Sequence, residues 1–159
     1  MSLILDGTAG VTFNNSTVQA SAGVVLQVVN ATFSSSFSTA SSTYVSTGFG
    51  ASITPKFATS KILILARVPV GFPAGVNNAG IGVALYRNTT ALYTPLAYEE
   101  FIVGTPVTPR WVTSINWLDS PATTSSTSYN LYVASYLGGG TASVNETGPT
   151  SITLMEIAG

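Results

Sequence analysis

The chain of 159 residues contains no histidine and no cysteine, and only 7% of its residues are Asp, Glu, Lys or Arg. Without His and Cys there is no imidazole base, no thiol nucleophile, no disulfide and none of the usual zinc ligand sets. An average soluble domain has about 25% charged residues, so carboxylate and amine catalysts are scarce as well. We therefore predict that the protein is not an enzyme and needs no cofactor and no metal ion.

The basic residues are too few and too scattered to bind nucleic acid. The net charge of the chain is −1, and the five cations are Lys56, Lys61, Arg67, Arg87 and Arg110. A nucleic-acid-binding surface needs several clustered cations to neutralise phosphates. We therefore expect no nucleic-acid partner.

Long apolar runs are also lacking. The most apolar stretch, residues 62–72, is interrupted by Arg67 and is shorter than the roughly 20 residues that a spanning helix needs. The first six residues have no basic region and too short an apolar run for a signal peptide. We expect no membrane insertion, and synthesis in a cytoplasm.

Serine and threonine are abundant and together supply about a quarter of the residues, beside 15 glycines and 45% apolar residues. Thr, Val, Tyr and Phe favour strands, whereas the helix formers Glu, Lys, Gln and Met are scarce. The length fits one domain that can bury a core of its own. The composition therefore predicts a soluble all-β protein.

The chain is predicted to divide after residue 23. Residues 1–23 are rich in Gly, Ser and Thr and have too little apolar surface for a core, so we predict a short extended N-terminal arm that becomes ordered on a partner. Residues 24–159 show about eight to ten short strands separated by turn residues. This pattern predicts an antiparallel β-sandwich or jelly roll.

The clearest predicted strand covers residues 61–72, where apolar side chains recur at every second position from Ile62 to Phe72. Leu63 and Leu65 fall on the opposite face, so we expect this part of the strand to be covered on both sides. Pro69 has no N–H to donate, and regular pairing should stop or bulge near it. Residues 87–90 are predicted to form a hairpin turn, and the Ser-rich residues 34–42 a link.

The acidic residues offer little chemistry. Glu99 and Glu100 could serve as acid and base or hold calcium, but neighbours on a strand point to opposite faces, which favours a solvated loop. Asp119 precedes a Ser-Pro pair and is predicted to cap a turn. Glu156 lies in an apolar terminal strand, where an unpaired buried carboxylate would be costly. We predict that Glu156 faces solvent, the alternative being a buried carboxylate satisfied by a cation or backbone donors.

Trp111 and Trp117 fall on one face of a predicted strand over residues 111–118. Six residues of strand separate the two rings by roughly 20 Å, so they could contact successive sugar units of a glycan but could not stack on each other. The same pair suits a sandwich core or a subunit interface. We predict packing in the core or an interface, with a glycan platform as the alternative.

Three stretches resemble bacteriophage virion proteins. LDGTAGVTFNNSTVQASAG (residues 5–23) resembles the G-x-T-F and Gly/Ser-Thr-x-Gln signature that opens many phage structural proteins, although Asn14-Asn15 stands where Pro-Asp or Pro-Asn is common. LDSPATTSSTSYNLYV (118–133) and SITLMEIAG (151–159) resemble the C-terminal half of a jelly-roll family of phage virions, especially of phages of cyanobacteria and marine bacteria. The resemblance implies a homotrimer that serves as a capsid cement (decoration) protein or as the distal domain of a tail fibre.

Three functions remain, of which an enzyme such as a polysaccharide depolymerase is the weakest because catalytic groups are scarce. A fibre takes a shaft of repeats or a coiled coil, and only about 23 residues without heptads precede the predicted domain. We therefore predict a cement protein on the capsid surface of a virion, whose partners are the major capsid protein and other copies of itself. The alternative is a tail-fibre tip that recognises host surface polysaccharide.

The predicted capsid contacts are the apolar residues of the arm. An extended segment can add a strand to the sheet of a neighbour, and each anchor contributes roughly 1.5–3 kcal/mol when it is fully buried. Three arms in one trimer would strengthen binding through effective concentration. The five anchors are Leu3, Leu5, Val11, Phe13 and Val18.

Overall fold

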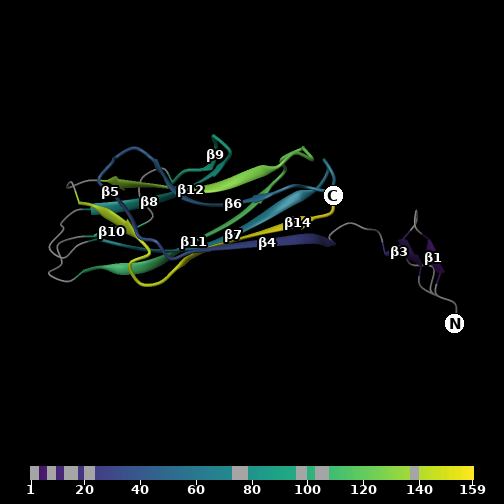
Figure 1. Cartoon of the computed structure of the whole chain (residues 1–159), viewed down its shortest axis with the longest axis horizontal. Coiled ribbons are helices and arrows are strands. Elements are labelled where there is room, and N and C mark those ends of the chain that lie inside the picture. The colour runs from purple at the N-terminus through teal and green to yellow at the C-terminus, as the bar shows by residue number, and fades with distance from the viewer. Residues whose placement is uncertain are drawn as a thin grey trace.

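The computed structural model describes residues 4–6, 10–12, 18–19, 24–72, 79–95, 100–102, 108–136 and 140–159. Every regular element in these residues is a strand, and none of them belongs to a helix that could cross a membrane. The strands form two packed antiparallel layers and one small separate sheet (Figure 1). The predicted fold class, an all-β sandwich, is confirmed.

One layer, the β8 sheet, has the strand order β10-β8-β12-β6, with β9 also paired to β8. Its strands are β6 (Val45–Ile53), β8 (Ala79–Arg87), β9 (Thr90–Tyr93), β10 (Glu100–Ile102) and β12 (Thr127–Tyr136). β8 and β9 form the predicted hairpin. Asn88 adopts a φ of 52° in its turn, a conformation that Asn tolerates better than most residues.

The other layer, the β7 sheet, has the strand order β4-β14-β7-β13-β5, and β11 pairs with the opposite edge of β7. Its strands are β4 (Val25–Phe33), β5 (Phe37–Thr39), β7 (Lys61–Gly71), β11 (Arg110–Asp119), β13 (Ala142–Val144) and β14 (Thr150–Ile157). β5 lies inside residues 34–42, so the prediction of a plain link there was incomplete. Its pairing with β13 places it at the border of the sheet.

The core fills the space between the two layers, as the alternation of β7 predicts. The inner residues Ile62, Ile64, Val68 and Val70 are all 0% exposed. They pack with inner residues of the β8 sheet, namely Ile81, Val83, Leu85, Leu131 and Val133. The outer face of β7 does not meet its prediction within one chain, because Leu63 and Leu65 remain partly exposed.

Pro69 interrupts the pairing of β7 on one edge only. Its carbonyl accepts the backbone N–H of Asn145 at 2.9 Å, so its missing N–H points to that same edge. There β14 pairs with β7 as far as Arg67, and β13 begins pairing at Val70. On the other edge the β11 register runs past Pro69 without a shift. The predicted break is therefore a change of partner strand.

The outer face of the β8 sheet is covered by the sheet's own tyrosines. Tyr86 and Tyr132 stack with ring centroids 3.9 Å apart, and Tyr44 meets Tyr136 edge to face at 6.3 Å. The rings of Tyr44 and Tyr136 lie so close over Gly82 that a Cβ there would clash with both. A glycine in β8 thus makes room for an aromatic cover.

Residues 1–23 contain a small sheet of their own. Its strands β1 (Ile4–Asp6), β2 (Gly10–Thr12) and β3 (Val18–Gln19) pair in the order β1-β2-β3 and pair with no strand of the sandwich in the described residues (Figure 1). The segment predicted as extended thus holds three short strands. Asn14 and Asn15, where the chain departs from the phage signature, lie outside the described residues.

Candidate functional site

Three of the five predicted arm anchors lie in the small sheet. Leu5 pairs with Val11 between β1 and β2, and Val18 pairs with Thr12 between β3 and β2. Leu3 and Phe13 lie outside the described residues. The register therefore brings Leu5 and Val11 directly opposite each other, and the role of all five as capsid contacts stays a prediction.

The two tryptophans lie on the inner face of β11, at the margin of the core. Trp111 packs beside Phe72, with ring centroids 6.2 Å apart, and Trp117 beside Tyr93 of β9, at 6.1 Å. Both are partly buried against the core cluster. Each tryptophan thus has its own aromatic partner, Phe72 just after β7 and Tyr93 in β9, and Trp117 also borders a surface hollow.

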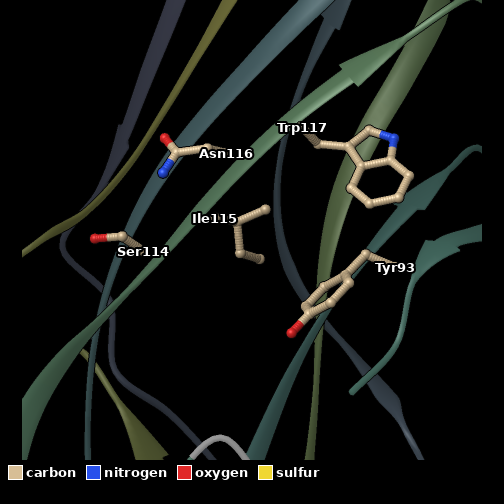
Figure 2. A pocket seen from close by; sticks show the side chains of 5 residues that line it. All are labelled: Tyr93, Ser114, Ile115, Asn116 and Trp117. Carbon is tan, nitrogen blue, oxygen red and sulfur yellow. The ribbon is translucent and has the colours of Figure 1, made fainter. Parts of the chain in front are cut away.

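This hollow, the edge hollow, has a volume of about 310 Å³ and is lined by Tyr93, Ser114, Ile115, Asn116 and Trp117. Figure 2 shows Trp117, Ile115 and Tyr93 on one side of β11, and Ser114 and Asn116 on the other. Consecutive residues of a strand point to opposite faces. A hollow that touches four residues in a row must therefore run along the edge of the strand.

The edge of β11 that borders the hollow is free of strand pairing in the part of the chain that the structure describes. β11 pairs with β7 over all ten of its residues and with no other strand there. A long edge strand presents backbone N–H and C=O groups to whatever approaches it. The edge hollow thus combines backbone groups, two aromatic rings and polar side chains.

A second hollow, the face hollow, lies on the outer face of the β7 sheet and has a volume of about 290 Å³. Ser114 and Ser151 are the register partners of Arg67 on its two sides, and Asn116 and Thr153 are those of Leu65. Its lining residues are Leu65, Ala66, Arg67, Ser114, Asn116, Ser151 and Thr153. The two hollows share Ser114 and Asn116.

Arg67 is the basic residue of the face hollow, and no carboxylate neutralises it in the described residues. The two salt bridges found there join Arg87 to Asp119 and Arg110 to Glu146. Arg67 donates through Nη1 to the carbonyl of Pro149 at 3.1 Å. A guanidinium has five N–H donors, so this bond leaves donors for a further partner.

An apolar row crosses the same face at the level of Leu63, the residue of β7 that precedes Leu65 on this face. Leu118, Leu63, Met155 and Val28 are successive register partners on β11, β7, β14 and β4, so they lie side by side across the sheet. Leu118 is 51% and Val28 is 55% exposed. Adjacent exposed apolar side chains of this kind mark surfaces that bind another protein.

Glu156 is fully buried, so the prediction that it faces solvent was wrong. Gln27 Nε2 donates to its Oε2 at 2.5 Å, and the backbone N–H of Lys56 donates to its Oε1 at 2.7 Å. Burial acts to raise the pKa of Glu156, but the hydrogen bonds from Gln27 and from the backbone of Lys56 and Phe57 lower it below its ordinary value. Through its hydrogen bond with Lys56, the carboxylate thus links the loop between β6 and β7 to β14.

Asp119 is buried at the end of β11, and in the described residues its carboxylate accepts from the side chains of Arg87 and Tyr129 instead of capping the turn that was predicted. Arg87 Nη1 lies 3.0 Å from both of its carboxylate oxygens, and the Tyr129 hydroxyl donates to Oδ2 at 2.7 Å. Burial, and next the hydrogen bond to Asp119, raise the pKa of Tyr129 far above its usual range. Since Arg87 and Tyr129 belong to the β8 sheet, the cluster ties the two layers together.

The remaining acidic candidates form no metal centre in the part of the chain that is described. No group of three or more Asp or Glu side chains comes together there. Glu100 begins β10, and Glu99 lies outside the described residues. The interpretation of this pair as a solvated loop stays a prediction.

The sequence identified Trp117 as a candidate but gave no role to its neighbours. The alternation over residues 111–118 predicts Ser114 and Asn116 together on the face opposite the tryptophans, but nothing in the sequence marks them as the lining of a hollow. Tyr93 comes from the hairpin, and its approach to Trp117 depends on how the two layers pack. Arg67 could not be linked to Ser151 without the β7–β14 register.

The sequence matches no protein-family model and no curated protein sequence. Among solved structures, the chain is similar to a chain in the structure of the infectious bursal disease virus Gx strain. The TM-score is 0.48, and the identity is 16% over 84% of this chain and 37% of that chain. It is also similar to a mutant VP2 protein of infectious bursal disease virus in derived T=1 particles, with a TM-score of 0.48 and 15% identity over 91% of this chain and 40% of that chain.

A third similar structure is dimeric latent PorU from Porphyromonas gingivalis, with a TM-score of 0.43 and 9% identity over 88% of this chain and 14% of that chain. The chain spans less than half the length of each of these three proteins. Values this low assign neither a family nor a function, so the fold class rests on the strand pairing of the chain itself.

Proposed function

We propose that the chain is a virion structural protein, namely a trimeric cement protein that stabilises a bacteriophage head by binding the major capsid protein. The motifs at residues 5–23, 118–133 and 151–159 support this proposal through their resemblance to phage virion proteins. The scarcity of charge also fits, since salt has little to screen on such a surface.

The observation that carries the proposal is the separate sheet of residues 1–23. β1, β2 and β3 pair only with one another in the described residues, while the two layers of the sandwich enclose a core of their own. A compact cap with a separate appendage is what a cement protein needs, because the appendage can bind the coat lattice while the cap stays folded.

The apolar row supports self-association. Leu118 and Val28 are more than half exposed in the single chain, and Leu63 and Met155 lie between them. Burying such residues contributes roughly 1.5–3 kcal/mol for each side chain that is fully covered. In the proposal, three copies cover these rows around a common axis.

The test uses phage heads that lack the protein. Deleting residues 1–23 should leave a folded trimeric cap that no longer binds heads. In the full chain, Leu5→Ser combined with Phe13→Ser should weaken binding severely without changing the melting temperature of the cap. A truncated protein that still decorates heads at full occupancy would show that the docking surface lies on the sandwich.

A tail component is the second candidate, favoured by the aromatic edge hollow at Trp117 and Tyr93. Electron microscopy of intact particles separates the two candidates. Density on the three-fold or quasi-three-fold positions of the head supports the cement protein, and density on the tail contradicts it.

A further inference from the structure

We propose that the edge hollow and the face hollow together bind an acidic oligosaccharide. The two hollows share the side chains of Ser114 and Asn116, so they form one surface that passes around the free edge of β11. This joint hollow extends from the rings of Tyr93 and Trp117 to the guanidinium of Arg67. The inference depends on this surface alone and applies to a head protein and to a tail protein alike.

The lining of the joint hollow fits a sugar. Tyr93 and Trp117 lie 6.1 Å apart at an interplanar angle of 39°, which presents tilted aromatic surface beside the hollow. The apolar C–H face of a pyranose packs on such rings, while its hydroxyls need donors and acceptors at the sides. Ser114 and Asn116 are exposed between the rings and Arg67 and supply these groups. Ser151 and Thr153 add two hydroxyls on the far side.

The charge of the hollow indicates that the sugar is acidic. Arg67 is its single ionic side chain and has no carboxylate partner in the described residues, unlike Arg87 and Arg110. A guanidinium binds a carboxylate through two parallel N–H donors. A uronic acid residue would place its carboxylate at Arg67 and continue the chain of sugars toward Trp117.

The apolar row does not compete for these residues. Leu63 and Leu118 are register partners, and Leu65 and Asn116 form the next pair on the same face. Self-association through the apolar row and sugar binding in the joint hollow therefore use different side chains of one face.

The chain has a built-in reporter, because it contains only two tryptophans. In Trp111→Phe, Trp117 is the sole indole and lines the hollow. We expect its fluorescence to change on titration with a hexasaccharide of galacturonic acid, and to change far less with maltohexaose, a neutral hexasaccharide of the same length. Calorimetry on the unmodified chain should give the same ranking of affinities.

Two variants test the assignment. Arg67→Gln should lower the affinity for the acidic hexasaccharide about tenfold or more, the usual effect of losing a charged hydrogen bond, and should leave the weak neutral binding unchanged. Lys61→Gln is the matched control, since Lys61 is exposed on the same strand and face but lies outside both hollows. Asn116→Ala alters an exposed side chain shared by both hollows, so it should weaken binding in a chain that folds normally.

Each outcome decides the proposal. A Trp117 response to the acidic sugar that falls in Arg67→Gln and persists in Lys61→Gln supports it. Equal binding of both hexasaccharides, or an affinity unchanged in Arg67→Gln and Asn116→Ala, overturns the acidic assignment. No response to either sugar at millimolar concentration overturns sugar binding altogether and leaves the β11 edge for pairing with a protein strand.

Discussion

The two layers of the sandwich differ in how their outer faces are completed. On the β8 sheet, Tyr44 and Tyr136 lie over Gly82, and Tyr86 stacks on Tyr132. On the β7 sheet, no described residue covers the apolar row in this way, and its ends at Leu118 and Val28 are more than half exposed. Among the described residues, one outer face thus has an aromatic cover, and the other leaves apolar side chains exposed. Composition does not distinguish them, since both sheets contain many apolar and hydroxyl residues.

The largest expected effect comes from placing charge on the uncovered face. Val28→Glu with Leu118→Glu should convert the proposed trimer to a single chain of 16.3 kDa, because carboxylates cannot be buried in an apolar interface without partners. The fold should persist, since both side chains are largely exposed in the single chain. Sedimentation equilibrium measures the mass, and circular dichroism confirms the β-sheet content.

The matched control places two glutamates on the other layer. Ser46 and Ser52 are exposed residues of β6 in the β8 sheet, so Ser46→Glu with Ser52→Glu adds the same charge away from the apolar row. We expect this variant to keep the mass of the unmodified protein. Dissociation by both double variants would show that added charge, rather than its position, separates the chains.

The next effect concerns the glycine beneath the tyrosines. A Cβ at position 82 meets the rings of Tyr44 and Tyr136, so Gly82→Ala should lower the free energy of unfolding by about 1–3 kcal/mol, the usual range for overpacking. Chemical denaturation at one chain concentration measures the change. In combination with Tyr44→Ala the penalty of the alanine should shrink, and simple additivity of the two changes would argue against the contact.

A smaller effect is expected from the stacked pair on the same face. Tyr86 and Tyr132 come from paired strands, with an interplanar angle of 23°. A double-mutant cycle with Tyr86→Ala and Tyr132→Ala should give a coupling energy of about 0.5–1.5 kcal/mol. The proposed trimer should remain intact in both single variants. A coupling energy near zero would mean that each tyrosine covers the sheet independently.

Period-two patterns made much of the fold predictable. The strand over residues 61–72 and the alternation of β11 follow from apolar spacing, because one face of each strand is buried whatever its neighbours are. The pairing partners do not follow from spacing. Pro69 illustrates this. Its missing N–H predicts an interruption of the strand pairing, but it does not predict that β13 replaces β14 as the partner of β7.

The errors at Glu156 and Asp119 have one physical cause. Both predictions considered only the neighbours of the carboxylate in the sequence, whereas each carboxylate is buried with donors from residues distant in the sequence. Gln27 lies 129 residues from Glu156, and Arg87 lies 32 residues from Asp119. The joint hollow could not be predicted from the sequence for the same reason, because its two ends belong to strands whose pairing is set by the whole sheet.

Acid should disturb the β7 sheet through Glu156, and this is the smallest expected effect. The folded pKa of Glu156 lies below its unfolded value, so its contribution to stability is present above about pH 4.5 and is lost as the pH falls through the folded pKa. Glu156→Gln should therefore be less stable at pH 7 and should lose less stability on acidification. Denaturation curves recorded at a series of pH values below 7 measure how the free energy of unfolding depends on pH.

Glu146→Gln is the control, at an exposed ion pair. It should change this pH dependence less, because solvent screens that pair. An equal pH dependence of the free energy of unfolding in Glu156→Gln and in the unmodified protein would contradict the role assigned to Glu156.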